Sequence, residues 1–351
     1  MTPKVQEPKY KIGLDIGSYA VKMMEIAQTP EQTALKCLGM RKIVGLSKEE
    51  ISGTIRSLAE EIKVSVKEAA ISVSGQSVIV RFISMPRMRE DELKAAIRFE
   101  AEKFIPFNIN DCVFDFQVLT KDSAAAGKNK NVNPAKTDDN KLNILLSVAK
   151  KDHVQAKVEV AERAGFGVRV VDVDSFALAN AFVKNFTSSG PDKISALVNV
   201  GARSTNLSIL RDNLIVFVRD PAMGSDDFND AIAKGCGVDI GSVEEIKASG
   251  AEKAGKLIDC IKPVLTQLLD DIKLSFEYYE NQSGRGIDDI YISGGGAGLP
   301  GLDDAMQEAF GVKPNRWDPL SSLVKAEGGP DTGSIDKMKD YFCVATGLAL
   351  R

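Results

Sequence analysis

The sequence predicts an α/β fold of two lobes, each built around its own sheet. Three observations predict it. A hairpin pattern occurs twice, at residues 12–26 (IGLDIGSYAVKMMEI) and 197–210 (LVNVGARSTNLSIL). Apolar segments of strand length and of helix length follow one another along the chain. The 351 residues are enough for two or more domains, each with a core of its own.

Composition narrows the function. A net charge of −4 argues against a dedicated nucleic-acid-binding protein, which would carry a strong basic bias. The five cysteines form no CxxC pair, so we expect reduced, buried thiols, and the single histidine, His153, is expected at the surface. No apolar stretch approaches the roughly 18 residues of a membrane span, and residues 1–11 lack the apolar segment of a signal peptide. We therefore expect any work at a membrane to depend on a partner.

The first half begins with a hairpin. Residues 12–16 and 21–26 alternate around a Gly-Ser turn and predict two strands. Residues 47–62 carry apolar residues at helical spacing behind a serine, which predicts a capped helix. One strand is expected across 71–83.

The stretch 83–168 predicts a small α+β module inserted into the larger unit. Its helix at 90–104 ends before Pro106, and the apolar face of that helix carries Leu93, Ile97, Ala101 and Phe104. The module then continues with strands at 112–119 and 142–149, a helix that begins at Asp152 and a strand at 168–173. Residues 121–141 are polar and lack aromatic side chains, so we expect a mobile loop there.

The second half repeats the strand-turn-strand plan. A small-residue helix at 175–182 and a linker at 187–193 precede the second hairpin, and another strand follows within 211–220. Helices are then expected around 224–235, 242–249, 255–281 and 337–351. The helix at 255–281 is amphipathic, and its apolar side carries Ile258, Ile261, Leu265, Leu268, Ile272 and Phe276.

Glycines follow a predicted strand at 292–302 (ISGGGAGLPGL). The spacing Gly296-x-Gly298-x-x-Gly301 occurs in dinucleotide-binding folds, but no βαβ unit with a ribose-binding acid follows it here. The underlying chemistry still holds, because glycines after a strand let the backbone approach a flat or anionic ligand closely.

The two hairpin turns indicate a phosphate site. Backbone amides of a turn rich in Gly and Ser or Thr can surround phosphate oxygens. An aspartate at the end of the preceding strand can hold Mg²⁺ through water. Two such turns facing each other across a cleft would hold a triphosphate from both sides, which would explain the duplication.

Together these motifs resemble the actin/Hsp70/sugar-kinase superfamily. DIGSYAVK (15–22) is similar to its first phosphate loop, NVGARSTN (199–206) to its second, and SGGGAGLPGL (293–302) to its adenosine loop. SFALANAF and FCVATGLAL resemble its two hinge helices, whose small residues allow close crossing. The resemblance implies an actin-like (ribonuclease-H-like) two-lobed α/β fold with duplicated subdomains and an inserted α+β subdomain similar to that of FtsA. The implied divisions are a first lobe at 1–82, 169–189 and 338–351, the inserted subdomain at 83–168, a second lobe at 190–222 and 255–337, and a small subdomain at 223–254.

Within this superfamily the chain most closely resembles the PilM family of type IV pilus assembly proteins. Residues 84–119, 170–182, 224–235 and 243–247 carry the resemblance. It implies an ATP-binding scaffold, cytoplasmic and peripheral at the inner membrane. The scaffold would bind the cytoplasmic N-terminal tail of a PilN-like single-span protein in a groove between the inserted subdomain and the first lobe. Other pilus platform and motor proteins are implied as partners, nucleic acid is not, and self-association stays open.

The resemblance also implies roles for individual residues. Asp15 would organise Mg²⁺ through water, and Lys22 would contact the phosphates as a point charge. Asp174 occupies the position where relatives hold a residue that orients the attacking water, although an acid at a helix start is also an ordinary N-cap. The other cofactor-binding residues would be Gly17, Ser18, Asn199, Gly201, Ser204, Thr205, Asn206 and Gly224 around the phosphates, Glu244 and Lys247 at the ribose or base, and Gly294, Gly295 and Gly296 at the adenosine.

Asn199 departs from the superfamily pattern, which has an acid at this position. An amide keeps the size but removes one negative charge beside the metal. Because phosphoryl transfer depends on positioning and charge, we expect hydrolysis to suffer more than binding. A neutral variation is the alternative.

The inserted subdomain offers candidate contacts for the partner tail. The helical pattern places Phe104 in the core, so the surface candidates are Arg98, Phe99 and Phe107. Two further functions stay open at this point. One is a filament-forming ATPase similar to FtsA, and the other is a small-molecule kinase of the same superfamily.

Overall fold

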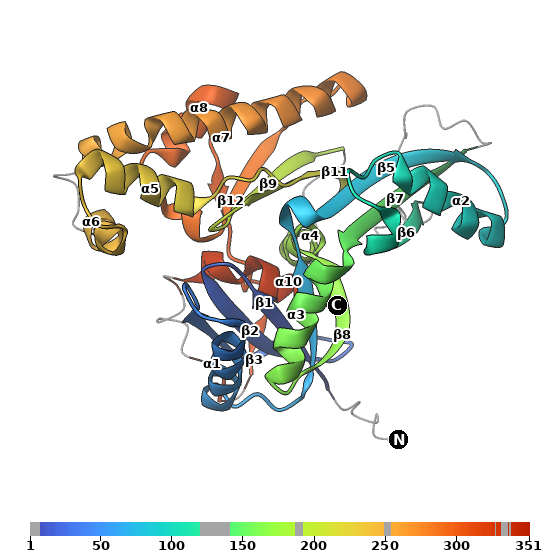
Figure 1. Ribbon diagram of the computed structural model, residues 1–351, viewed down its shortest axis with the longest axis horizontal. Coiled ribbons are helices and arrows are strands. Elements are labelled where there is room, and N and C mark those ends of the chain that lie inside the picture. The colour runs from blue at the N-terminus through green and yellow to red at the C-terminus, as the bar shows by residue number, and fades with distance from the viewer. Residues whose placement is uncertain are drawn as a thin grey trace.

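The computed structural model describes residues 8–119, 141–186, 192–248, 254–326, 328–330, 336 and 338–351. Nearly all of the expected loop at 121–141, and most of the linker at 187–193, lies outside these residues. Within them the chain forms three sheets, which build two lobes and a smaller unit to one side (Figure 1).

The first lobe is built on a six-stranded sheet. Its strands lie in the order β14 (Val324–Lys325), β3 (Thr33–Lys42), β2 (Ala20–Gln28), β1 (Lys9–Ile16), β4 (Glu68–Val73) and β8 (Gly167–Val173). Strands β1 and β2 are antiparallel, which confirms the first hairpin and sets Asp15 opposite Lys22. Strand β3 was not predicted, because consecutive residues along it are buried and its apolar pattern does not alternate.

Helices cover both faces of this sheet. The helices are α1 (Lys48–Glu61) and α3 (Lys151–Arg163) on one face and α10 (Cys343–Ala349) on the other. Ser47 caps α1 in the predicted capping box with Glu50. Helix α3 packs against α1, β4 and β8, although the expected inserted subdomain ran to residue 168. Its buried Val160 and Ala161 belong to the core of the first lobe.

The second lobe has a five-stranded sheet. Its strands lie in the order β11 (Leu214–Arg219), β10 (Thr205–Arg211), β9 (Ile194–Val200), β12 (Asp289–Ser293) and β13 (Asn315–Arg316). Its helices are α5 (Ser225–Cys236), α6 (Val243–Ala248), α7 (Ala254–Ser283) and α8 (Leu302–Phe310). The predicted apolar face of α7 is buried except for Ile258, which is 37% exposed, because the neighbouring Leu257 points into the core instead.

Two helices cross between the lobes. Helix α4 (Asp174–Asn185) lies against the second sheet, and α10 lies against the first. A Cβ on Gly347 would lie 1.7 Å from the carbonyl oxygen of Ala177, and one on Gly13 would lie 2.0 Å from that of Ala345. The small residues predicted for these helices therefore let backbones touch directly, which fixes the two lobes relative to each other.

The smaller unit contains a three-stranded sheet in the order β5 (Val78–Pro86), β7 (Lys141–Lys150) and β6 (Cys112–Leu119), together with α2 (Glu90–Glu102). The single strand predicted at 71–83 is wrong, because a short 3₁₀ turn at Gly75–Ser77 sends β4 and β5 into different sheets. Gly75 makes this possible with a φ of +77°. Phe104 is 38% exposed rather than in the core, since α2 ends before it.

Several expectations concern the chain as a whole. All five cysteines are free, and the Sγ atoms of Cys236 and Cys260 lie 4.0 Å apart. His153 is half-buried, not at the surface, because it lies close to Ser74 and Asp174 of neighbouring segments. None of the helices within the described ranges combines the length and apolar character that a membrane span requires.

Candidate nucleotide site between the lobes

The first turn joins a buried carboxylate to a lysine. Asp15 ends β1 at 6% exposure, and the Lys22 ammonium donates to its Oδ2 at 3.0 Å. Burial raises the pKa of Asp15, and Lys22 opposes that rise. A Cβ on Gly17 would lie 2.9 Å from the Lys22 Nζ, so the glycine leaves room for the ammonium above the turn.

Backbone donors remain available at this turn. The Gly17 amide donates to the Ala20 carbonyl at 3.1 Å, which closes the turn. Among the described residues, the amides of Ser18 and Tyr19 donate to no other group. The free amides that can meet an anion are thus those of Ser18 and Tyr19, one residue further along than Gly17.

The second turn has the same shape but a neutral side-chain network. The Asn199 amide donates to Asn206 Oδ1 at 2.9 Å and accepts from the Ser293 hydroxyl at 3.2 Å. The Gly201 amide donates to Ser204 at 3.0 Å, which closes this turn as Gly17 closes the first. The amides of Ala202, Arg203 and Ser204 have no partner within the described part of the chain.

Helix α5 supports the second turn from below. The amides of Ser225 and Asp226 donate to the carbonyls of Gly201 and Ala202 at 2.8 and 2.9 Å. A Cβ on Gly224 would lie 2.4 Å from the Ala202 carbonyl oxygen, so this predicted glycine is required for the close approach. Thr205 lies beside it as a fully buried residue whose hydroxyl donates to the Met223 carbonyl at 2.8 Å.

The glycine loop forms the third side of the site. Gly294 has a φ of +87°, and a Cβ there would lie 2.4 Å from the Val200 carbonyl oxygen. A Cβ on Gly295 would lie 2.7 Å from the ring of Tyr341, and one on Gly296 would meet the Val200 side chain at 2.4 Å. The three glycines therefore let this loop pack flat against β9 and Tyr341.

Tyr341, which sequence reasoning missed, lies between the lobes. Burial raises the pKa of its hydroxyl, and the charges of Tyr19 and Glu244 raise it further. Tyr341 therefore lies close enough to the first turn and to helix α6 to interact electrostatically with both. On α6 the predicted pair is also joined, since Lys247 Nζ donates to Glu244 Oε1 at 3.0 Å.

A second missed residue, Asp220, links the lobes. It follows β11 of the second lobe. Its carboxylate accepts hydrogen bonds from the Gly75 amide, just after β4 of the first lobe, at 3.1 Å and from the Ser175 hydroxyl of α4 at 3.3 Å. Burial raises the pKa of Asp220 to about 6. The buried Nδ2 of Asn206 makes no hydrogen bond among the described residues, yet it lies near enough to Asp220 to lower that pKa. The sequence signal was an acid at the carboxyl end of a strand, directly before Pro221.

Asp174 occupies the centre of this arrangement. It is the first residue of α4, and its charge raises the pKa of both Asp15 and Asp220. Lys157 of α3 approaches from the other side and donates to the Ile16 carbonyl. Burial and the charge of Lys157 lower the pKa of His153, which keeps this ring neutral.

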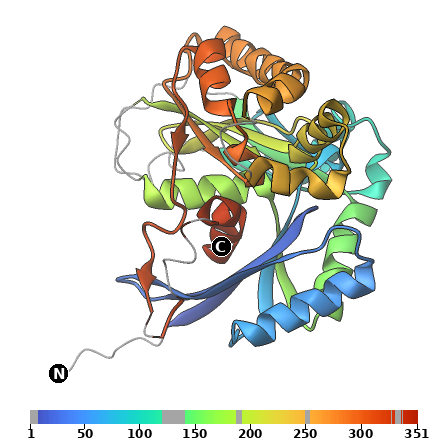
Figure 2. The same ribbon diagram turned by 90° about the vertical axis from the view of Figure 1, so that its left-hand side faces the viewer.

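The residues present fit a magnesium nucleotide. Free amides on two turns, one lysine and a flat glycine loop are suited to phosphates and a base. Both views place the first hairpin so that it points toward the second lobe (Figure 1, Figure 2). Within the described ranges no three His, Cys, Asp or Glu side chains gather closely enough to bind a metal directly. Hydrated Mg²⁺ needs no such cluster, because one carboxylate and the phosphates suffice.

The candidate partner residues lie away from this site, on the smaller unit. Phe99 is 68% exposed. Arg98 is also exposed, and its guanidinium donates a hydrogen bond to Asn110 Oδ1 at 2.6 Å. Phe107 is half-buried against the core of the unit, and Lys150 Nζ lies 4.9 Å from its ring centre. Of the three, Phe99 presents the most apolar surface to a partner.

Comparison with known proteins identifies relatives over nearly the whole chain. The family model described as type IV pilus assembly protein PilM matches residues 13–351. A solved structure of a PilM–PilN type IV pilus biogenesis complex is similar at a TM-score of 0.83 and 28% identity, covering 97% of this chain and 98% of that one. The ethanolamine utilization protein EutJ from Carboxydothermus hydrogenoformans is similar at 0.56 and 14% identity, covering 98% and 90%. The fold is thus the actin-like two-lobed α/β fold that the sequence predicted.

Proposed function

The chain belongs to the family of type IV pilus assembly protein PilM, and from this premise we propose that it is a nucleotide-gated scaffold of the pilus machine. It binds magnesium ATP between the lobes and hydrolyses it slowly or not at all. The observation that supports this most strongly is the pair of turns at Asp15–Lys22 and Asn199–Asn206, each with unpartnered backbone amides.

The residues divide the work of binding. The amides of Ser18 and Tyr19 would hold phosphate oxygens from one side, and those of Ala202 to Ser204 from the other. Lys22 supplies a positive charge, and Asp15 would hold a hydrated Mg²⁺, which neutralises phosphate charge when bound. Gly294 to Gly296, with Tyr341, offer a flat surface to the base.

Slow turnover follows from the second turn. Both oxygen and nitrogen of the Asn199 amide already bond to Asn206 and Ser293. The side chain at this position carries no negative charge to place a metal or an attacking water, and Asp220, the buried carboxylate beside Asn206, bonds instead to Gly75 and Ser175. The geometry favours retention of ATP over its hydrolysis.

We further propose that the partner is the cytoplasmic tail of a PilN-like membrane protein. The relative of similar structure was solved as a complex named for PilN. The tail would lie between the smaller unit and the first lobe, with Phe99 and Arg98 as contacts. The protein would then act in the cytoplasm, held peripherally at the inner membrane by that partner.

Calorimetry with Mg-ATP and with a PilN tail peptide tests both parts. We expect one ATP per chain, and tail affinity that changes when ATP is present. Phosphate release on the order of 1 per second, as in ordinary kinases, would contradict the scaffold proposal. Failure of the tail to bind, with ATP binding intact, would remove the partner and leave the nucleotide site.

A further inference from the structure

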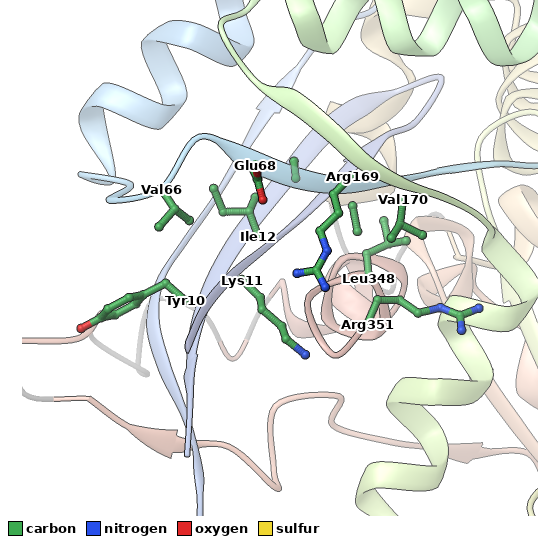
Figure 3. A pocket seen from close by; sticks show the side chains of 11 residues that line it. Tyr10, Lys11, Ile12, Val66, Glu68, Arg169, Val170, Leu348 and Arg351 are labelled. Atoms are coloured by element: carbon green, nitrogen blue, oxygen red, sulfur yellow. The ribbon is translucent and has the colours of Figure 1, made fainter. Parts of the chain in front are cut away.

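A cavity of about 200 Å³ lies in the first lobe, at the end of β1 opposite to the nucleotide site (Figure 3). Strands β1, β4 and β8 form its floor, and the carboxyl end of α10 forms a wall. Ile12, Val170 and Leu348 make the apolar part of the lining. No residue of the two turns, of the glycine loop or of the three-stranded sheet takes part, so the cavity is separate from both proposed sites.

The backbone directs two cations into this space. Lys11 lies two residues before Gly13 on β1, and therefore on the same face of the sheet, which is the face that α10 covers. On β8 the register with β4 shifts between Ala69 and Ala70, so that Arg169 has no opposing residue. Such a bulge re-aims a side chain and is frequent beside functional sites. Figure 3 shows Lys11 and Arg169 reaching toward the same space beside Leu348.

Neither of these two cations, Lys11 and Arg169, forms an ion pair within the described residues. Burial lowers the pKa of Lys11, and the charges of Arg169 and Lys9 lower it further. The remaining guanidinium of the cavity, that of Arg351, is bonded to Asp172 with Nη2 at 2.7 Å from Oδ1, and Glu68 is exposed at the rim. Lys11 is partly buried and Arg169 is exposed, and two like charges that line one cavity repel each other unless an anion joins them.

We propose that this cavity binds a phosphate group between Lys11 and Arg169. A guanidinium offers paired donors to a phosphate, and an ammonium adds a point charge. Free phosphate carries about 1.5 to 2 negative charges near neutral pH, and the phosphodiester of a lipid headgroup carries one, so two cations attract either group. The volume is enough for a phosphate with a few waters, since each water occupies about 30 Å³ of liquid. The group can come from free phosphate or from a phospholipid headgroup.

Thermal unfolding in inorganic phosphate tests the site, with sodium chloride at equal ionic strength as reference. A ligand that binds only the folded state raises the melting temperature. We expect a saturable rise in the wild type and at least tenfold weaker binding in Lys11→Gln and in Arg169→Gln. Lys48→Gln, which removes an exposed cation elsewhere on this lobe, should behave as the wild type.

A rise of the same size in Arg169→Gln, or in sodium chloride alone, would overturn the proposal. Co-sedimentation with vesicles identifies the source. Binding to phosphatidylglycerol vesicles that Arg169→Gln abolishes, with none to phosphatidylcholine vesicles, would support a lipid headgroup. Phosphate binding without vesicle binding would support free phosphate. Both results uphold the site, because each depends on the same two cations.

Discussion

The two turns that face the cleft share a backbone plan but differ in their charges. At the first turn a buried acid and a lysine form an ion pair, with Lys22 Nζ 3.0 Å from Asp15 Oδ2. At the second turn the matching position is Asn199, and neutral hydrogen bonds run from Ser293 through Asn199 to Asn206. The first turn therefore carries charged side chains, whereas the second turn carries a neutral hydrogen-bond network.

The second lobe does have a buried carboxylate, but it lies outside the turn. Its buried carboxylate is Asp220, beside Asn206 at the other end of the same network. There it bonds to Gly75 and Ser175 of the opposite side, so it joins the lobes rather than facing the turn. The second hairpin thus shares the turn geometry of the first, while the buried acid of its lobe makes contacts elsewhere.

Removal of the charge at the first turn should have the largest effect. Lys22→Met leaves Asp15 buried and unpaired, so we expect the free energy of unfolding to fall by about 3 kcal/mol. Mg-ATP affinity should fall at least 100-fold, measured by calorimetry. The double variant Asp15→Asn/Lys22→Met should recover the stability but not the affinity. Recovery of both would show that Lys22 has no part in binding.

The second-largest effect is expected for Asp220→Asn, on how the free energy of unfolding depends on pH. Burial raises its pKa to about 6 from 3.8, so the folded state holds a proton that the unfolded chain has released. The stability that this provides is complete below about pH 4 and is lost as pH rises through 6. Asp220→Asn should abolish that loss and gain about 3 kcal/mol over the wild type by pH 7. Denaturant unfolding checks this, and the exposed Asp230→Asn should leave the pH profile unchanged.

Restoring the acid at the second turn should change catalysis more than binding. For Asn199→Asp we expect turnover to rise about tenfold while ATP affinity stays within about threefold, because positioning depends on charge at this place. A phosphate-release assay measures the first and calorimetry the second. Asn199→Ala, which also breaks the network, should not raise turnover. An unchanged rate in Asn199→Asp would mean that the amide is a neutral variation.

The closing glycines should give the smallest effects, and in different quantities. A Cβ on Gly201 would lie 2.8 Å from the Ser204 carbonyl oxygen, whereas one on Gly17 would lie 2.9 Å from the Lys22 ammonium and 3.0 Å from the Ala20 carbonyl oxygen. Gly201→Ala should therefore cost about 1 kcal/mol of stability. Gly17→Ala should cost less stability but weaken ATP binding several-fold. Thermal unfolding measures the stability of both variants, and calorimetry measures their ATP affinity. A larger stability loss in Gly17→Ala, or a larger affinity loss in Gly201→Ala, would contradict this assignment.

Local patterns predicted much of this fold because they act over a few residues. The hairpin of β1 and β2 and the capping box of Ser47 and Glu50 follow from neighbouring side chains. The patterns failed where tertiary contacts decide. Residues 71–83 alternate as one strand, yet a left-handed Gly75 divides them between two sheets.

The same limit applies to the site. Asp15, Lys22, Asn199 and the glycines lie within short motifs, so the sequence alone predicts them as site residues. Asp220 and Tyr341 gain their place only because distant segments meet, with Gly75 at the one and Tyr19 and Glu244 at the other. An acid at a strand end before a proline marks Asp220 as a candidate, but the sequence does not show which distant groups Asp220 or Tyr341 meets.

Amide NMR during titration with Mg²⁺ and a non-hydrolysable ATP analogue tests the central claim most directly. The claim is that both turns hold one triphosphate. We predict that the amide signals of Ser18 and Tyr19 shift together with those of Ala202, Arg203 and Ser204, along one saturation curve with one nucleotide per chain. Shifts confined to one turn, or two curves with different midpoints, would contradict it.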